Sequence, residues 1–357
     1  GPIGQIFEKR LNSFFGSKYS SIISNGTSAL YLLGKVLDWK KNDIIINSPI
    51  TFLAGPNSVV YNGSTPDFVD INLNNFTIDL NKLENKIKKF NGVKKVKSVI
   101  ATDYAGHPCD WEGLRYLKSK YNFTLINDNC HAMGAKLNGS QQYAVKYSDF
   151  VILSFHAVKN ITTGEGGAIL TNRKKENEKI KLLSSHGLIR NFSNQKKLKY
   201  DGYYEMVDLG YNLRLSDIQS ALGITQIKKL SKFVKKRNEI AKMYFDFLGN
   251  CEKILLPKSS NNIYHGYHLY PCQIDFEKNK INKKDFFKKM LKNKIKLQVH
   301  YIPVHLQPFY KKKFGFKIGD FKNAEKFFSN EISLPIYYSL KKNEVKYISE
   351  KIIECLK

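Results

Sequence analysis

Hydrophobic and polar positions alternate in blocks along the first two-thirds of the chain. Apolar runs of strand length, each ending in polar or small residues, occur at 19–24, 43–48, 97–106, 123–135 and 148–157. Segments with helical apolar spacing lie between them, for example 27–39 and 111–122. Strands that alternate with helices indicate an α/β fold with a mostly parallel sheet covered on both faces. Ligands bind such sheets at the carboxyl ends of the strands, which is where these runs become polar.

The last third of the chain has a different pattern. A long helical region is predicted over 213–248, with a break near Gly223. After it come a strand-like run, a helical run, a second strand-like run and a second helical run, at 264–274, 282–293, 295–301 and 342–356. We therefore expect a large domain over 1–225 and a smaller C-terminal α+β domain over 226–357, with the long helical region linking them.

Length and composition agree with a globular protein of two domains. The chain has 357 residues, of which 42% are hydrophobic. It contains no apolar run of about 20 residues, so no transmembrane helix or other membrane association is expected, and its start shows no secretory signal. The five cysteines include no CxxC pair, which argues against a disulfide framework or a metal site. These features predict a cytoplasmic protein without a metal.

The formal net charge is +27, which raises the question of a nucleic-acid partner. The excess is almost all lysine and is spread along the whole chain, whereas arginine, the usual reader of bases, is scarce. We interpret the positive charge as a general compositional bias toward lysine, and we expect no nucleic-acid partner. A nucleic-acid binder remains an alternative, and the field would also attract an anionic substrate such as a nucleotide diphosphate.

Lys159 is the one lysine in the segment SFHAVKNITTGEGGAIL, residues 154–170. It follows an apolar strand and precedes several glycines, which allow a backbone to turn tightly and approach a ligand. An amine held at such a strand end can be desolvated, and burial lowers its pKa and makes it nucleophilic. A lysine is more often a solvated surface charge, and the segment alone leaves this alternative open.

Two other sites in the sequence, a carboxylate at a strand end and a helix start after a strand, would suit the same cofactor chemistry. Asp128 ends the buried run TLIN, where a carboxylate is costly unless it meets a cation. A lysine Schiff base with an aspartate beside the pyridinium nitrogen is typical of pyridoxal 5'-phosphate (PLP) enzymes; capping of a turn is the alternative. Thr27 and Ser28 open a helix directly after a strand, which suits a phosphate group, although an ordinary helix cap is also possible.

The chain resembles the DegT/DnrJ-type nucleotide-sugar aminotransferases in the stretches SNGTSALYL, SPITFLAGPN, DYAGHPCD, NDNCHAMGA, SFHAVKNITTGEGGAILTN, SSHG, LGYNLRLSDIQSALG and VHYIPVHLQPFY. These stretches span nearly the whole chain. The resemblance implies the PLP-dependent transferase fold type I, which is aspartate aminotransferase-like. Within the family, the lysine motif and VHYIPVHLQPFY look most similar to the pseudaminic acid branch.

The resemblance implies roles for the matching residues around the cofactor. Lys159 would bind PLP covalently and move protons, and Asp128 would pair with the pyridinium nitrogen. His131 would lie near the ring and its phenolic oxygen. Phe52 would stack on the ring face, with core packing as the alternative. The phosphate would be held by Thr27, Ser28 and Ser154.

Other matching positions imply a partner subunit and a substrate side. Asn212 would reach the same phosphate from the partner subunit, so the active site would be shared in a homodimer. Substrate contacts would come from His186, His300, Tyr301 and His305, with packing or surface roles as the alternative. Two further residues, His268 and Tyr270, are expected to be structural.

The implied reaction transfers an amino group, from L-glutamate, to C4 of a UDP-4-keto-6-deoxy-N-acetylhexosamine in the biosynthesis of a pseudaminic acid-type surface glycan. Alternatives are another nucleotide 4-keto sugar, such as a bacillosamine, legionaminic acid or 4-amino-arabinose precursor, or a PLP-binding regulator. Relatives that act as dehydratases replace the lysine with histidine, so Lys159 argues for transamination. One departure from the family is Ser184 in SSHG, where arginine is usual.

Overall fold

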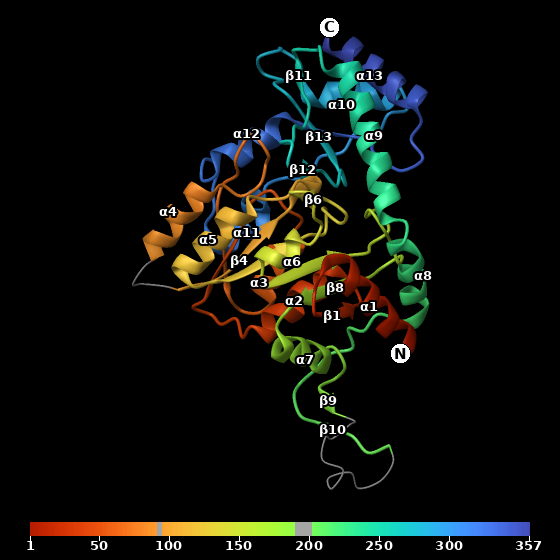
Figure 1. The fold of residues 1–357 in the computed structure, drawn as a ribbon. Helices are drawn as coiled ribbons and strands as arrows, with labels where there is room; N and C mark the ends of the chain where they lie inside the picture. Colours follow the sequence, from red (N-terminus) through yellow and green to blue (C-terminus); the bar gives the residue numbers. More distant parts are fainter. Residues whose placement is uncertain (91–94, 190–201) are drawn as a thin grey trace.

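A computed structural model describes residues 1–90, 95–189 and 202–357 of the chain. Its main element is a seven-stranded sheet, drawn with its covering helices in Figure 1. In the order of the sheet, the strands are β1 (Tyr19–Ile23), β8 (Gly167–Thr171), β7 (Phe150–Ser154), β5 (Thr124–Asp128), β4 (Val96–Thr102), β2 (Ile44–Asn47) and β3 (Thr65–Phe68). The pairs from β7 to β3 are parallel, and β8 is antiparallel to both β7 and β1. The predicted mostly parallel sheet is therefore confirmed.

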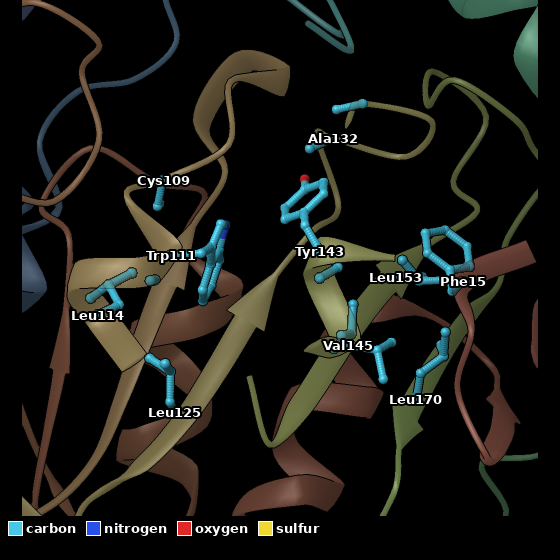
Figure 2. Packing of buried hydrophobic residues seen from close by; sticks show 14 of the residues in the cluster. Phe15, Cys109, Trp111, Leu114, Leu125, Ala132, Tyr143, Val145, Leu153 and Leu170 are labelled. Atoms are coloured by element: carbon cyan, nitrogen blue, oxygen red, sulfur yellow. The ribbon is translucent and has the colours of Figure 1, made fainter. Parts of the chain in front are cut away.

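Helices cover both faces of this sheet, because successive residues of each strand point to opposite sides. On β5, for example, Leu125 and Ile126 belong to two different hydrophobic clusters. One face packs against α1 (Pro2–Phe15), α4 (Leu80–Phe90), α5 (Trp111–Tyr121) and α6 (Tyr143–Tyr147). The other packs against α2 (Gly26–Val36), α3 (Ala54–Tyr61) and α7 (Lys174–Leu183). Figure 2 shows Trp111 of α5 and Tyr143 of α6 in the first cluster.

The long helical region consists of α8 (Asp217–Ile227) and α9 (Leu230–Leu248). The expected break near Gly223 is wrong, since the chain breaks between these helices. Gly223 lies buried inside α8, where a Cβ atom would come within 2.5 Å of the ring of Phe7. The glycine therefore allows α8 to pack closely on α1. The capping box of Ser216 and Gln219 begins α8.

The C-terminal part builds a second, smaller sheet with helices on it. The antiparallel strands β11 (Ile254–Leu255), β13 (Tyr270–Ile274) and β14 (Glu331–Leu334) pack with α9, α10 (Lys283–Lys292) and α13 (Lys342–Leu356) in one core. Two further helices in this region are α11 (Pro308–Phe314) and α12 (Lys322–Asn330). The α+β architecture is as predicted. Figure 1 shows α9 running from α8 into this region.

One predicted strand is absent from this sheet. The run 295–301 forms only an isolated bridge between Gln298 and Ser333. The physical reason lies at its end, where the backbone N–H of His300 donates to the carboxylate of Glu331 at 3.1 Å instead of to a strand carbonyl. Short elements complete the described fold: η1 (Tyr104–Gly106), β6 (Lys136–Leu137), β9 (Leu188–Ile189), β10 (Glu205–Met206), β12 (Ile263–Tyr264) and η3 (Val304–Leu306).

Helix α9 passes from one core to the other. Val234 is the last member of the cluster under the large sheet, and Ile240 is the first of the C-terminal cluster. A further cluster joins the two parts, because Val304 and Tyr310 pack with Phe68 of β3. The domain boundary at 225/226 remains a prediction. No helix of the described residues is long and apolar enough to cross a membrane.

Candidate active site

A cavity of about 1040 Å³ lies at the carboxyl ends of β5 and β7. The large sheet contributes the start of α2 and the residues that follow β5 and β7. The C-terminal part contributes the segment 296–301 and strand β14 with the residues after it. This is the edge of the sheet at which the sequence predicts ligand binding.

Lys159 lies in the loop after β7 and lines the cavity. Its backbone N–H donates to the carbonyl of His156 at 3.0 Å, and the side chain of Asn160 donates to two backbone carbonyls, those of Met133 and Gly266. The loop is thereby fixed. Burial lowers the pKa of the Lys159 amine, against the opposing electrostatic effects of Cys130 and Asp128. A desolvated amine of this kind is a better nucleophile than a surface lysine.

Asp128 ends β5 and is 7% exposed. Its Oδ1 accepts a hydrogen bond from the backbone N–H of Cys130 at 3.2 Å. Its charge acts on the Lys159 amine, although no salt bridge within the described residues joins the two groups. A buried carboxylate that lines a cavity and has no salt bridge within the described residues is suited to a positively charged ring nitrogen.

The start of α2 forms one wall of the cavity. The side chain of Asn25, not that of Thr27 or Ser28, caps the helix by accepting from the N–H of Ser28 at 2.8 Å. The N–H groups of the first turn have no partner within the helix and favour an anion there. A Cβ on Gly26 would lie 3.0 Å from the Cβ of Ser154, so glycine lets the helix start approach the end of β7. The residues Thr27, Ser28 and Ser154 and the N–H groups at the start of α2 therefore line the same part of the cavity, as a phosphate site requires.

Aromatic side chains and an imidazole line the cavity. Phe52 is 55% exposed, so it projects into the cavity rather than packing in the core. His131 is buried, and its Nε2 lies 3.2 Å from the hydroxyl of Tyr301. Burial and the charge of Lys159 lower the pKa of His131 well below its usual value, which keeps the imidazole neutral.

Two residues of the segment 296–301 carry polar groups on the C-terminal side. The Nδ1 of His300 lies 2.8 Å from the Oγ of Ser333, and its backbone carbonyl accepts from the hydroxyl of Tyr104. Burial lowers the pKa of His300 to about 4, with a further contribution from Lys159. Burial also raises the pKa of Tyr301, with Asp128 adding to the effect, so its phenol is a proton donor at neutral pH.

Residues 1–353 match the DegT/DnrJ/EryC1/StrS aminotransferase family. The chain belongs to this family. A Campylobacter jejuni protein named UDP-4-amino-4,6-dideoxy-N-acetyl-beta-L-altrosamine transaminase is 35% identical over 352 residues, which are 98% of this chain and 89% of that protein. The solved structure of Helicobacter pylori PseC, described as an aminotransferase involved in the biosynthesis of pseudoaminic acid, is 30% identical with a TM-score of 0.89, covering 100% of this chain and 91% of that one.

The PLP form of Spr1654 from Streptococcus pneumoniae has a similar fold, with 26% identity, a TM-score of 0.87 and coverage of 100% of this chain and 91% of that one. The predicted family, fold type I, aminotransferase activity and PLP cofactor are therefore confirmed. The site fits the cofactor on its own geometry. The buried Asp128 carboxylate has no salt bridge within the described residues, the Gly26 helix start is held close to β7, and the Lys159 amine is desolvated.

Three of the predicted site residues do not line the cavity of this aminotransferase. His305 is 0% exposed, and its Nε2 lies 3.0 Å from a carboxylate oxygen of Glu325. His186 and Asn212 are exposed and neighbour each other through a backbone bridge between Ser185 and Asn212. Their predicted contacts with substrate or cofactor therefore do not arise within one chain's cavity.

Sequence reasoning missed several residues that this aminotransferase brings to the cavity. His268, for which the sequence predicts a structural role, lines it, whereas Tyr270 is buried in the C-terminal core as expected. Arg237 also lines the cavity and donates through Nη1 to the carbonyls of Tyr267 and Ile336, both at 2.9 Å. No local signal marks either residue, because their roles depend on contacts between segments distant in sequence.

Proposed function

We propose that this aminotransferase moves an amino group from L-glutamate to C4 of a UDP-4-keto-6-deoxy-N-acetylhexosamine, in the biosynthesis of a pseudaminic acid-type surface glycan. The observation that carries the proposal is the desolvated Lys159 amine, which lines a cavity together with the buried Asp128 carboxylate and a helix start. The names of the Campylobacter jejuni relative and of Helicobacter pylori PseC support the sugar class.

The cofactor side of the proposal assigns roles to residues of the large domain. Bound PLP supplies an electron sink for the substrate carbon. Lys159 holds the cofactor and moves the proton at the reacting carbon, while Asp128 pairs with the ring nitrogen. Phe52 and His131 would contact the ring. The phosphate would be held by the N–H groups at the start of α2 with the hydroxyls of Thr27, Ser28 and Ser154.

The substrate side is assigned to the C-terminal part of the cavity. His300 and Tyr301 present an imidazole and a phenol to the sugar, and both remain neutral at pH 7 because of burial. Lys296, whose side chain is exposed and lines the same cavity, offers a cation for the diphosphate. A substrate role for His186 or His305 has no support from this cavity.

The proposal includes a homodimer with shared active sites. Asn212 is exposed and does not line its own chain's cavity, so it would serve the phosphate only of a partner subunit. Large apolar side chains near it in sequence are also exposed, including Leu209 at 72% and Ile218 at 86%. Exposed apolar residues of this kind are suited to burial between subunits. A cytoplasmic location is also proposed, supported by the five free cysteines.

The test is incubation of the PLP-loaded protein with L-glutamate and UDP-4-keto-6-deoxy-N-acetylhexosamines of both C5 configurations, with product identification by mass spectrometry and NMR. We expect a 4-amino sugar from one configuration and none from Lys159→Ala. Selective turnover of a dTDP-linked keto sugar instead would contradict the sugar assignment. Normal conversion of L-glutamate to 2-oxoglutarate without any amino sugar would point to a different keto substrate.

A further inference from the structure

A line of hydrogen bonds runs from the cavity into the C-terminal core. It begins at His300, which lines the cavity, and its Nδ1 lies 2.8 Å from Oγ of Ser333. The Ser333 hydroxyl donates to Oε1 of Glu331 at 2.5 Å. The three side chains therefore connect the cavity with a carboxyl group beneath it.

Glu331 is the buried end of this line. It is the first residue of β14 and is 0% exposed. Its second oxygen, Oε2, accepts from the backbone N–H of His300 at 3.1 Å, so both carboxyl oxygens are directed at His300, one of them through Ser333. A buried carboxyl group is costly to folding. Its two bonds toward a cavity histidine suggest a role beyond packing.

The hydrogen-bond directions define what His300 presents to the cavity. When the Ser333 hydroxyl donates to Glu331, its oxygen accepts from Nδ1–H of His300. The neutral imidazole then carries its lone pair on Nε2. Since Nδ1 is engaged by Ser333, Nε2 is the nitrogen left for a ligand in the cavity.

We propose that His300, Ser333 and Glu331 form a proton relay that takes a proton from the ammonium group of the amino donor and holds it on Glu331. This inference rests on the proposed aminotransfer from an amino acid donor. His300 is the catalytic residue of the relay, and Ser333 and Glu331 act through it.

The transfer conserves atoms and charge. An N–H bond of the donor's ammonium breaks, its electron pair stays on the nitrogen, and the proton bonds to Nε2 of His300. The Nδ1–H bond of His300 breaks and this proton bonds to Oγ of Ser333. The Ser333 hydroxyl proton passes to Oε1 of Glu331, which becomes a carboxylic acid while the imidazole stays neutral. The reverse sequence returns the proton to the oxygen that leaves C4 of the sugar as water.

The proton affinities of the two ends support this direction. Burial lowers the pKa of His300 to about 4, so a proton does not remain on the imidazole at neutral pH. Burial raises the pKa of Glu331 to about 8, against the hydrogen bonds from Ser333 and His300 and the charge of Lys283. A proton that enters at His300 while Glu331 is ionised is therefore more stable on Glu331, so the relay accepts protons near and above pH 8, where the carboxylate is populated.

The groups around the relay come from several elements. Lys283 of α10 faces Glu331, and burial lowers the pKa of its amine to about 8. Burial keeps the pKa of Cys272 on β13 and of Tyr104 in η1 well above their usual values, and Glu331 adds to both shifts, so these groups stay neutral. The charge of Lys159 acts on His300, and both residues line the cavity. Lys283 is thus the neighbour of Glu331 that titrates in the same range, and a test must detect the carboxyl group itself.

Infrared spectroscopy of the PLP-loaded protein provides that test without substrate. We expect a protonated carboxyl band that disappears as the pH rises through the mildly alkaline range and is absent from Glu331→Gln. Asp103, whose pKa burial raises to about 6, loses its proton at lower pH and so gives a band that the titration separates. The absence of an alkaline-titrating band in the wild-type protein would overturn the relay.

Single-turnover kinetics with L-glutamate alone, at a pH above 8 where Glu331 is ionised, test the transfer. We expect Glu331→Gln and Ser333→Ala each to slow the donor half-reaction by about 100-fold with little change in the apparent affinity for L-glutamate. The double variant should be no slower than the slower single variant, because both changes break one path. Ser349→Ala is the matched control, since Ser349 is another buried serine of the C-terminal core and donates to the carbonyl of Val345 at 2.8 Å.

The outcomes separate the relay from the proposed sugar. Additive losses in the double variant, or a lowered melting temperature with a wild-type rate and pH profile, would show that Glu331 is only structural. A wild-type enzyme that aminates none of the UDP-sugars, yet whose donor half-reaction depends on Glu331, would contradict the sugar assignment and support the relay.

Discussion

The Nζ of Lys159 lies 3.5 Å from the Nε2 of His268, although the two residues are 109 positions apart in the chain. Burial lowers the pKa of both groups, and the charge of Lys159 further lowers that of His268. A neutral imidazole beside the amine accepts a hydrogen bond without adding a second positive charge. The loop after β7 and the segment before β13 thus meet at the Lys159 amine.

Replacement of Lys159 by alanine should abolish the covalent attachment of PLP and lower turnover by roughly 10³–10⁴-fold, since the amine also moves a proton. The check is the visible-range absorbance of lysine-bound PLP, which borohydride should abolish in the wild-type protein. Lys312→Ala, which removes an exposed lysine, is the control and should behave as wild type. Full transaminase turnover by Lys159→Ala would exclude Lys159 as the reacting amine.

Asp128→Asn should weaken PLP binding, because it removes the charge that would meet the ring nitrogen. A charge-assisted hydrogen bond contributes about 1.5–3 kcal/mol, so we expect a roughly 10–100-fold rise in the dissociation constant for PLP. Fluorescence titration of the apoprotein with PLP measures it. Asp246→Asn, at an exposed position of α9, controls for net charge. Equal affinities of the two variants would contradict the pairing.

Asp103 should make the stability of the fold depend on pH. Its carboxylate accepts hydrogen bonds from Cys109, Trp111, Asn129 and Tyr143 and is buried. Burial raises its pKa from 3.8 to about 6 despite these bonds. A carboxyl group with a raised folded-state pKa stabilises the fold below its unfolded pKa, and this contribution is lost as the pH rises through about 6.

The measurement is the melting temperature across this acidic range. Asp103→Asn should show a flatter dependence on pH than the wild-type protein, even where its overall stability is lower. Asp246→Asn again serves as the exposed control and should leave the slope unchanged. A slope in Asp103→Asn equal to that of the wild type would assign the pH dependence to other groups.

Arg237→Met should destabilise the fold, because three backbone carbonyls would lose their donor, those of Tyr267, His268 and Ile336. Unsatisfied buried acceptors cost about 1–3 kcal/mol each before relaxation, so we expect a loss of about 3 kcal/mol in the free energy of unfolding. Urea denaturation measures it, with the exposed Arg115→Met as control. If the two variants are equally stable, Arg237 does not hold these segments together.

Local patterns were sufficient to predict β1, β2, β4, β5 and β7 of the seven-stranded sheet. The run 123–135 predicts a buried strand that ends in polar residues, and β5 ends at Asp128. The predicted run 295–301 fails as a strand because the N–H of His300 bonds to the side chain of Glu331. Gly223 is misleading because its role depends on a residue distant in sequence. Locally a glycine indicates a helix break, but here the missing side chain leaves room for the ring of Phe7.

The sequence by itself determined the family and the order of the strands that it predicted, and it predicted Lys159 and Asp128 as cofactor-side residues. These features depend on short-range periodicity and on motifs contiguous in the chain. Only the tertiary structure decided that His268 meets Lys159 and that Glu331 lies behind His300. The reason is physical, since burial and hydrogen bonding between distant segments set these contacts and the proton affinities that follow from them.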